Sequence, residues 1–156
     1  RIWVPLKGIM NVPRTLYFAL CSLLMTSCSS FEKEWNQSVA EYKAGNIETP
    51  AGPWVGSWNT TTNGHMGDLR AIVKPSPARN GEYSFRYHAT WGSFFRGTYQ
   101  VDFPVIRRGS TYQVDGSKSL GPFGRFGHKA KIKGHSFNAT YSSDKGDLGT
   151  FDLKRP

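Results

Sequence analysis

The stretch YSFRYHA, residues 83–89, decides the fold, because large apolar residues alternate in it with polar ones. An alternation of period two is the pattern of a β-strand that has one buried face and one exposed face. The same pattern returns in about eight short runs between residues 54 and 154. These runs are centred on residues 54–58, 69–73, 83–89, 99–105, 112–114, 130–132, 137–141 and 151–153.

Turn-forming dipeptides separate several of these runs. They are Asn63-Gly64, Asn80-Gly81, Arg108-Gly109, Gly134-His135 and Lys145-Gly146. Short strands joined by hairpins form antiparallel sheets, and closing such a sheet on itself removes its exposed edges. We therefore predict an all-β fold, a single antiparallel up-and-down barrel of about eight strands over residues 53–156, with a β-sandwich as the alternative.

Aromatic side chains dominate the predicted inner face of this barrel. An eight-stranded barrel encloses a space that side chains can just fill, or that holds one small ligand. So many rings favour a filled interior, although buried tyrosine hydroxyls would still need hydrogen-bond partners there. If a ligand does bind, the candidate residues are Trp58, Tyr87, Tyr99, Tyr112 and Arg155.

The triplet Gly56-Ser57-Trp58 on the first predicted strand resembles the Gly-x-Trp signature of the calycin barrels, the lipocalin and avidin group. In that group the Trp plugs one end of the barrel, often under an Arg from near the last strand. The resemblance rests on these three residues and on the strand count. It implies that Arg155 covers Trp58 by a cation–π contact. It also implies a carrier of a small apolar or amphipathic ligand.

Residues 10–27 have the pattern of an export signal. Arg14 precedes an apolar run of about ten residues, 16–25, which is too short to span a bilayer as a helix. We therefore place the start of the precursor at Met10 and take residues 1–9 as a fragment edge or an over-extended reading frame. A single transmembrane anchor is an alternative to the signal peptide.

The sequence LMTSC, residues 24–28, resembles the lipobox of bacterial lipoprotein precursors, with Met25 where Leu, Val or Ile is usual. The resemblance implies cleavage between Ser27 and Cys28 and attachment of acyl chains to Cys28, which would hold the protein on a membrane. Ser29 follows the cysteine in place of Asp, which implies the outer membrane, facing the periplasm. The alternative is an ordinary secretory signal with an incidental cysteine.

Residues 28–52 are predicted to form the lipidated amino terminus, a short helix and a linker. Glu32 stands at the capping-box position relative to Ser29, and Gly45-Asn46 is a stop signal. The helix would carry an apolar stripe that docks on the domain or on the membrane surface. The stripe consists of Phe31, Trp35, Val39 and Tyr42.

The chain is basic, with 20 Lys and Arg against 11 Asp and Glu, a net charge of +9. The export signal argues against nucleic acid as the partner, and leaves an anionic envelope polymer, acidic lipid or another protein. Lysines at every second position would form one charged face of a strand. This face is a candidate anionic-surface patch, and the alternative is that its lysines protect an exposed sheet edge. The patch consists of Arg125, Lys129, Lys131 and Lys133.

Motifs for catalysis are missing from the sequence. Cys21 and Cys28 are the only cysteines, so the domain has no thiol for a disulfide, a nucleophile or a zinc site. There is no Gly-x-Ser-x-Gly elbow and no phosphate-binding glycine loop. We expect no cofactor and no metal, and favour a non-enzymatic, lipid-anchored binding or interaction module. A small hydrolase, with His88 or His128 and an Asp from separate strands, is the second alternative after the carrier.

Overall fold

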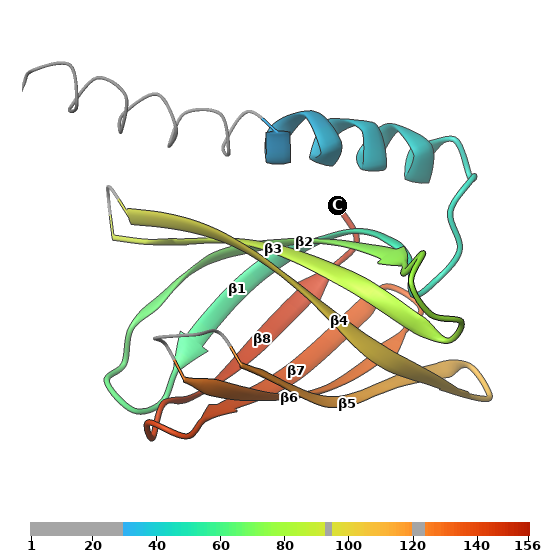
Figure 1. Ribbon diagram of the computed structural model, residues 1–156. Coiled ribbons are helices and arrows are strands. Elements are labelled where there is room, and N and C mark those ends of the chain that lie inside the picture. The colour runs from blue at the N-terminus through green and yellow to red at the C-terminus, as the bar shows by residue number, and fades with distance from the viewer. Residues whose placement is uncertain (1–29, 93–94, 120–123) are drawn as a thin grey trace, which may run out of the picture.

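The computed structural model describes residues 30–92, 95–119 and 124–156. It contains one closed antiparallel barrel in which each strand pairs with its neighbours in sequence and β1 pairs with β8 (Figure 1). The predicted all-β up-and-down barrel is therefore confirmed, and the sandwich is excluded. The strands are β1 (Gly52–Thr60), β2 (Met66–Pro75), β3 (Glu82–Trp91), β4 (Phe95–Arg108), β5 (Thr111–Ser119), β6 (Arg125–Lys133), β7 (Ser136–Ser143) and β8 (Leu148–Lys154).

Two glycines permit the closure between β1 and β8. A Cβ on Gly56 would lie 2.0 Å from the carbonyl oxygen of Asp152, and a Cβ on Gly149 would lie 2.2 Å from that of Asn59. No real side chain tolerates such distances, so any other residue at these positions would push the two strands apart. The seam that turns the sheet into a barrel therefore depends on these glycines.

Arg155 seals the end of the barrel where β1 begins. Its guanidinium lies 3.7 Å from the ring centroid of Trp54 and 4.8 Å from that of Tyr42. It also donates hydrogen bonds to the carbonyl oxygens of Ala51 (2.7 Å) and Pro53 (3.0 Å). Apolar side chains fill the barrel behind this plug, among them Trp54, Val73, Phe85, Ile132, Phe137 and Leu153.

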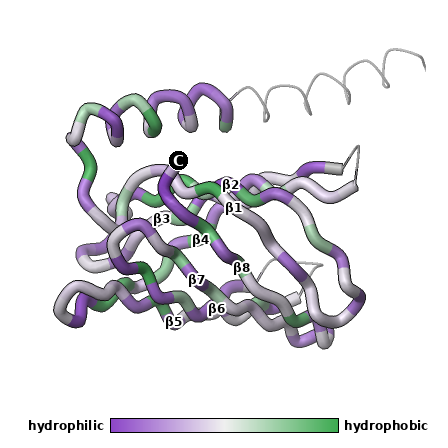
Figure 2. The backbone as a smooth tube through the Cα atoms, turned by 180° about the vertical axis from the view of Figure 1, so that it is seen from behind, coloured by the Kyte–Doolittle hydropathy of each residue, from purple (hydrophilic) through white to green (hydrophobic). Residues whose placement is uncertain are grey.

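A helix at residues 30–43 lies across the outside of the barrel, as both Figure 1 and Figure 2 show. Its predicted apolar stripe docks on the domain: Phe31 is fully buried and stacks on His88 of β3 at 4.8 Å. Ile72 points outward from β2 yet is only 1% exposed, because the helix covers this side of the wall. The stripe is therefore not free to lie on a membrane.

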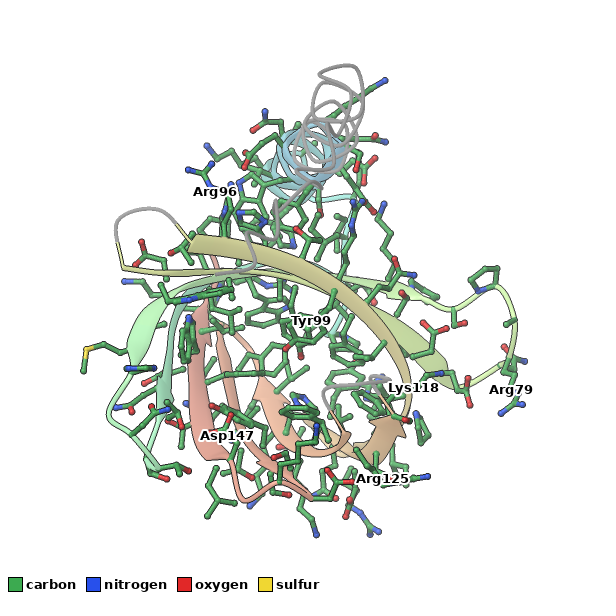
Figure 3. All side chains as sticks on the ribbon, turned by 60° about the vertical axis from the view of Figure 1, so that its left-hand side comes forward. Arg79, Arg96, Tyr99, Lys118, Arg125 and Asp147 are labelled. Carbon is green, nitrogen blue, oxygen red and sulfur yellow. The ribbon has the colours of Figure 1, made fainter. Side chains whose placement is uncertain are left out.

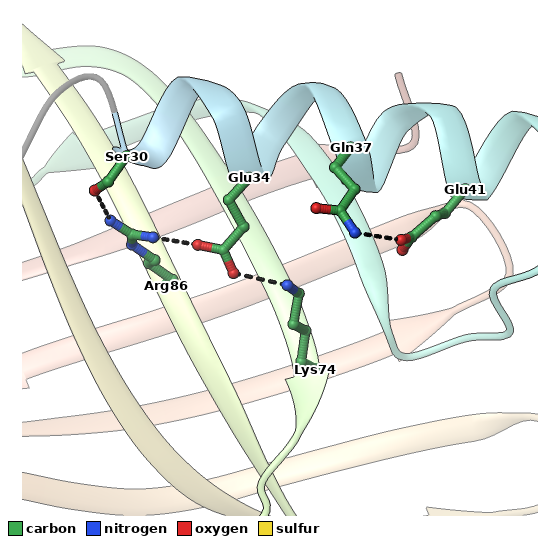
Figure 4. Close-up of polar contacts among 6 residues, drawn as sticks. All are labelled: Ser30, Glu34, Gln37, Glu41, Lys74 and Arg86. Atoms are coloured by element: carbon green, nitrogen blue, oxygen red, sulfur yellow. Dashed lines mark hydrogen bonds and ion pairs between the residues drawn. The ribbon is translucent and has the colours of Figure 1, made fainter.

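Ion pairs reinforce the docking of the helix. Glu34 pairs with both Lys74 and Arg86, and Arg86 also donates to Ser30 at 2.8 Å (Figure 4). Burial alone would raise the pKa of Glu34, but the hydrogen bonds from the two cations lower it overall. Glu32 pairs with Arg70, whose hydrogen bond lowers the pKa of that carboxyl. The acidic start of the helix thus matches the basic outer face of β2 and β3.

The predicted leader (1–9), signal peptide (10–27) and lipid-attachment residue Cys28 lie outside the described residues, as does Ser29. Within the described ranges, no helix combines the length and the apolar character needed to cross a membrane.

Candidate functional site: the barrel cavity

A cavity of about 590 Å³ opens at the end of the barrel opposite to Arg155. The interior predicted as filled is thus filled over one half and open over the other. Ala89 and Gly97 stand side by side at inward positions and add little bulk. In the pairings that the structure describes, β4 and β5 are joined only from Val105 to Arg108, so their halves nearer the mouth are not hydrogen-bonded to each other.

Two tryptophans form one wall of the mouth. The ring of Trp58 meets that of Trp91 edge-on at 6.5 Å, and its Nε1 donates a hydrogen bond to the carbonyl oxygen of Thr90 at 2.9 Å. The indole reaches this oxygen across Gly67, where a Cβ would lie 2.9 Å from Nε1. A side chain at Gly67 would therefore displace the indole of Trp58 from its hydrogen bond with Thr90.

The floor of the cavity is a layer of rings around His128. This histidine is 6% exposed and stacks parallel to Phe103 at 5.3 Å. Its Nε2 lies 3.3 Å from the hydroxyl oxygen of Tyr87, within hydrogen-bond distance. Tyr87 in turn stacks on Tyr99 at 5.0 Å. The floor therefore combines an imidazole and two phenol hydroxyls with apolar ring faces.

The floor groups are neutral at neutral pH. Burial lowers the pKa of His128 to about 4, so the imidazole carries no proton charge. Burial raises the pKa values of Tyr87 and Tyr99, so both hydroxyls keep their protons. Such groups can form hydrogen bonds with a ligand but offer it no counter-ion.

Charged side chains lie at the mouth instead. Lys118 of β5 and Asp147, in the turn between β7 and β8, both line the cavity and lie on different sides of it (Figure 3). Thr60 donates a hydrogen bond to Asp147 at 2.8 Å and so fixes the carboxylate. Burial also raises the pKa of Tyr141, on the strand that leads into this turn.

The structure brings together three of the five predicted ligand-binding residues. Trp58, Tyr87 and Tyr99 all line the cavity. Tyr112 does not, because it pairs with Ile132 in the filled half and its ring lies under Arg107 at 5.6 Å. The fifth residue, Arg155, belongs to the sealed end.

The expected contact between Arg155 and Trp58 is wrong, because Arg155 covers Trp54. The reason is register: Lys154 pairs with Val55, which brings the next residue of the chain level with Trp54. The triplet Gly52-Pro53-Trp54 has the same Gly-x-Trp spacing as Gly56-Ser57-Trp58, but starts four residues earlier. The Trp that plugs an end of this barrel under an arginine is therefore Trp54.

His128 is predicted from the sequence only as part of a hydrolase site and is not among the predicted ligand-binding residues. The alternation along β6 indicates its inward position. Residues 126, 128, 130 and 132 lie on one face, and Gly127, Lys129, Lys131 and Lys133 lie on the other, so His128 shares the inward face with Ala130 and Ile132.

The predicted basic patch lies on the outer face of the barrel. Lys129, Lys131 and Lys133 are exposed, and β6 pairs with a strand on each side, so they do not protect a sheet edge. Arg125 begins the same strand and donates to Ser117 at 3.1 Å. A second hollow of about 590 Å³ lies beside Lys129, and most of the residues that line it are serine, threonine and glycine.

His88 and His128 do not share a site, although His128 lines the same cavity as Asp147. His88 points outward under the helix and bonds to Thr98 at 2.8 Å, whereas His128 points inward, so the barrel wall separates them. Within the described residues, no three His, Cys, Asp or Glu side chains gather closely enough to hold a metal ion.

No family model matches this chain, and neither a curated protein nor a solved structure matches it.

Proposed function

We propose that this protein is an exported, lipid-anchored and non-enzymatic binding module, which carries a small apolar or amphipathic ligand in its barrel. The observation that carries the proposal is the cavity of about 590 Å³. Small-molecule sites are typically hollows of roughly 300–1,000 Å³ with apolar walls and a few fixed polar groups. The cavity has this character, with Trp58 and Trp91 at the mouth and His128 at the floor.

The lipid anchor supports a ligand that comes from a membrane or its surroundings. Ser30, where the described helix begins, follows Cys28 by only two residues. The amino-terminal end of this helix points toward the end of the barrel where β1 finishes, which is the end with the cavity (Figure 1). An anchor at Cys28 would therefore hold the mouth nearer to the bilayer than the sealed end.

Titration with N-phenyl-1-naphthylamine, a neutral probe that fluoresces in apolar surroundings, tests the cavity. We expect saturable binding to the wild-type protein. Gly97→Leu places a side chain in the cavity, since a Cβ there meets only the Trp91 ring at 3.5 Å, and should abolish binding. The matched control is Gln100→Leu, on the exposed face of the same strand, which should bind normally. Equal binding by both variants would contradict a site inside the barrel.

Metabolic labelling with a palmitate analogue tests the anchor. The wild-type protein should take up the label and sediment with membranes, and Cys28→Ser should lose both properties. Cys21→Ser, within the predicted signal, is the control and should keep them. Unchanged labelling of Cys28→Ser would refute lipidation at that residue.

A further inference from the structure

Tyr99 has a hydroxyl that the described residues leave free to bond to a ligand in the cavity. Figure 3 shows this tyrosine inside the barrel, where it lines the cavity. Its neighbour Tyr87 has a partner in His128, at 3.3 Å. For the Tyr99 hydroxyl, by contrast, no hydrogen-bond partner is found in the described part of the chain. Tyr99 is only partly buried, so its hydroxyl is open to the cavity. A ligand that fills the cavity excludes water from this hydroxyl, so a ligand that supplies a hydrogen-bond partner is favoured over one that leaves the hydroxyl unpaired.

The surroundings of Tyr99 decide which partner is acceptable. The rings nearest to it belong to neutral groups, and the charged residues that line the cavity, Lys118 and Asp147, lie at the mouth. A carboxylate or ammonium group at the floor would lose its hydration without gaining a counter-ion, which is strongly unfavourable. A neutral hydroxyl or carbonyl group meets no such penalty and can bond to the phenol.

We propose that the barrel binds an uncharged amphipathic ligand with its hydroxyl or carbonyl group innermost, hydrogen-bonded to Tyr99. The apolar part of the ligand then lies toward the mouth, against Trp58 and Trp91. This inference rests on the proposed carrier function and adds to it the polarity and the orientation of the ligand. Tyr99 is the residue that determines specificity, because it distinguishes ligands by one hydrogen bond.

Matched ligands and matched tyrosines test the inference. 2-Naphthol and naphthalene differ by one hydroxyl, and their affinities are measured by displacement of N-phenyl-1-naphthylamine at pH 7. One net hydrogen bond corresponds to about tenfold in affinity. Tyr99→Phe should therefore lower the preference for 2-naphthol over naphthalene by about tenfold relative to the wild type, and leave the affinity for naphthalene unchanged. Tyr112→Phe, in the filled half, should leave the preference as it is.

Each outcome of this experiment bears on one part of the argument. If naphthalene binds and Tyr99→Phe changes the preference by less than about twofold, the role of Tyr99 is refuted while the carrier function stands. If the ionised 2-naphthoate binds as tightly as 2-naphthol, the requirement for an uncharged ligand is refuted. If neither naphthalene nor 2-naphthol displaces the probe, and the probe itself does not bind, both the inference and the carrier function are overturned.

Discussion

Arg155 carries a charge that is buried between two aromatic rings at the sealed end of the barrel. Replacing it by Met removes the cation from the faces of Trp54 and Tyr42, at 3.7 and 4.8 Å. It also leaves the carbonyl oxygens of Ala51 and Pro53 without their donor. Arg155→Met keeps most of the side-chain volume, so the change isolates the charge and its hydrogen bonds.

The size of the effect follows from these contacts. A cation–π contact shielded from water contributes about 2 kcal/mol, and a hydrogen bond from a charged group contributes about 1.5–3 kcal/mol. Part of this gain is offset by the cost of burying the charge, which lowers the pKa of Arg155 to about 10. We therefore expect Arg155→Met to lower the free energy of unfolding by about 3 kcal/mol.

Urea unfolding followed by tryptophan fluorescence measures this loss as a lower midpoint at unchanged slope. Arg155→Lys should fall between the wild type and Arg155→Met, because an ammonium group keeps the charge but lacks the planar donor fork. Arg79→Met is the control: the Arg79 side chain is 76% exposed and pairs with Glu82 at the surface, so its loss should cost less than about 1 kcal/mol. A cost below about 1 kcal/mol for Arg155→Met would refute the reasoning.

Three further predictions concern the floor, the seam and the helix. His128 has a pKa of about 4 in the folded protein and 6.5 as its ordinary value, so between these pH values the unfolded state binds the proton and the folded state does not. Stability should therefore fall by up to about 3 kcal/mol from pH 7 to pH 4, and His128→Gln should remove that part of the fall in urea titrations at the two pH values. Gly56→Ala should cost about 2 kcal/mol in thermal unfolding by parting β1 from β8, whereas Gly97→Ala, whose Cβ has room, should cost far less. Phe31→Ala should free the 30–43 helix for proteolysis while the near-ultraviolet circular dichroism of the barrel stays unchanged; an equally protected helix would contradict docking through Phe31.

The barrel could be predicted from sequence because burial on one face imposes period two on every strand. Residues 83–89 carry this pattern without a break. The docked helix was also readable from its own stripe, but its position on the wall was not. A sign of that position lies in Ala71-Ile72-Val73, where three apolar residues in succession break the alternation. Such a run indicates a strand that is covered on both faces, as β2 is under the helix.

The depth of a residue inside the barrel was harder to predict than the face on which it lies. Trp54 and Trp58 share the inward face, yet four residues of extended strand separate them by about 13 Å. One therefore plugs the sealed end and the other borders the mouth. Only the register between β1 and β8 tells which of them meets Arg155. That register depends on long-range pairing, which a local pattern does not reveal.

The number of aromatic residues predicts a filled interior, but the structure contains a cavity because some of these rings lie over glycines. Phe103 lies over Gly116, where a Cβ would be 2.4 Å from the ring, and Tyr141 lies over Gly149 at the same distance. Each ring thus occupies the space that a side chain at the glycine would have filled. A ring that covers a glycine adds little to the filling of the barrel centre. Inward glycines on strands next to those that carry the rings are therefore a sign, readable from the sequence, of a hollow barrel. They explain how an interior so rich in aromatic residues keeps room for a ligand.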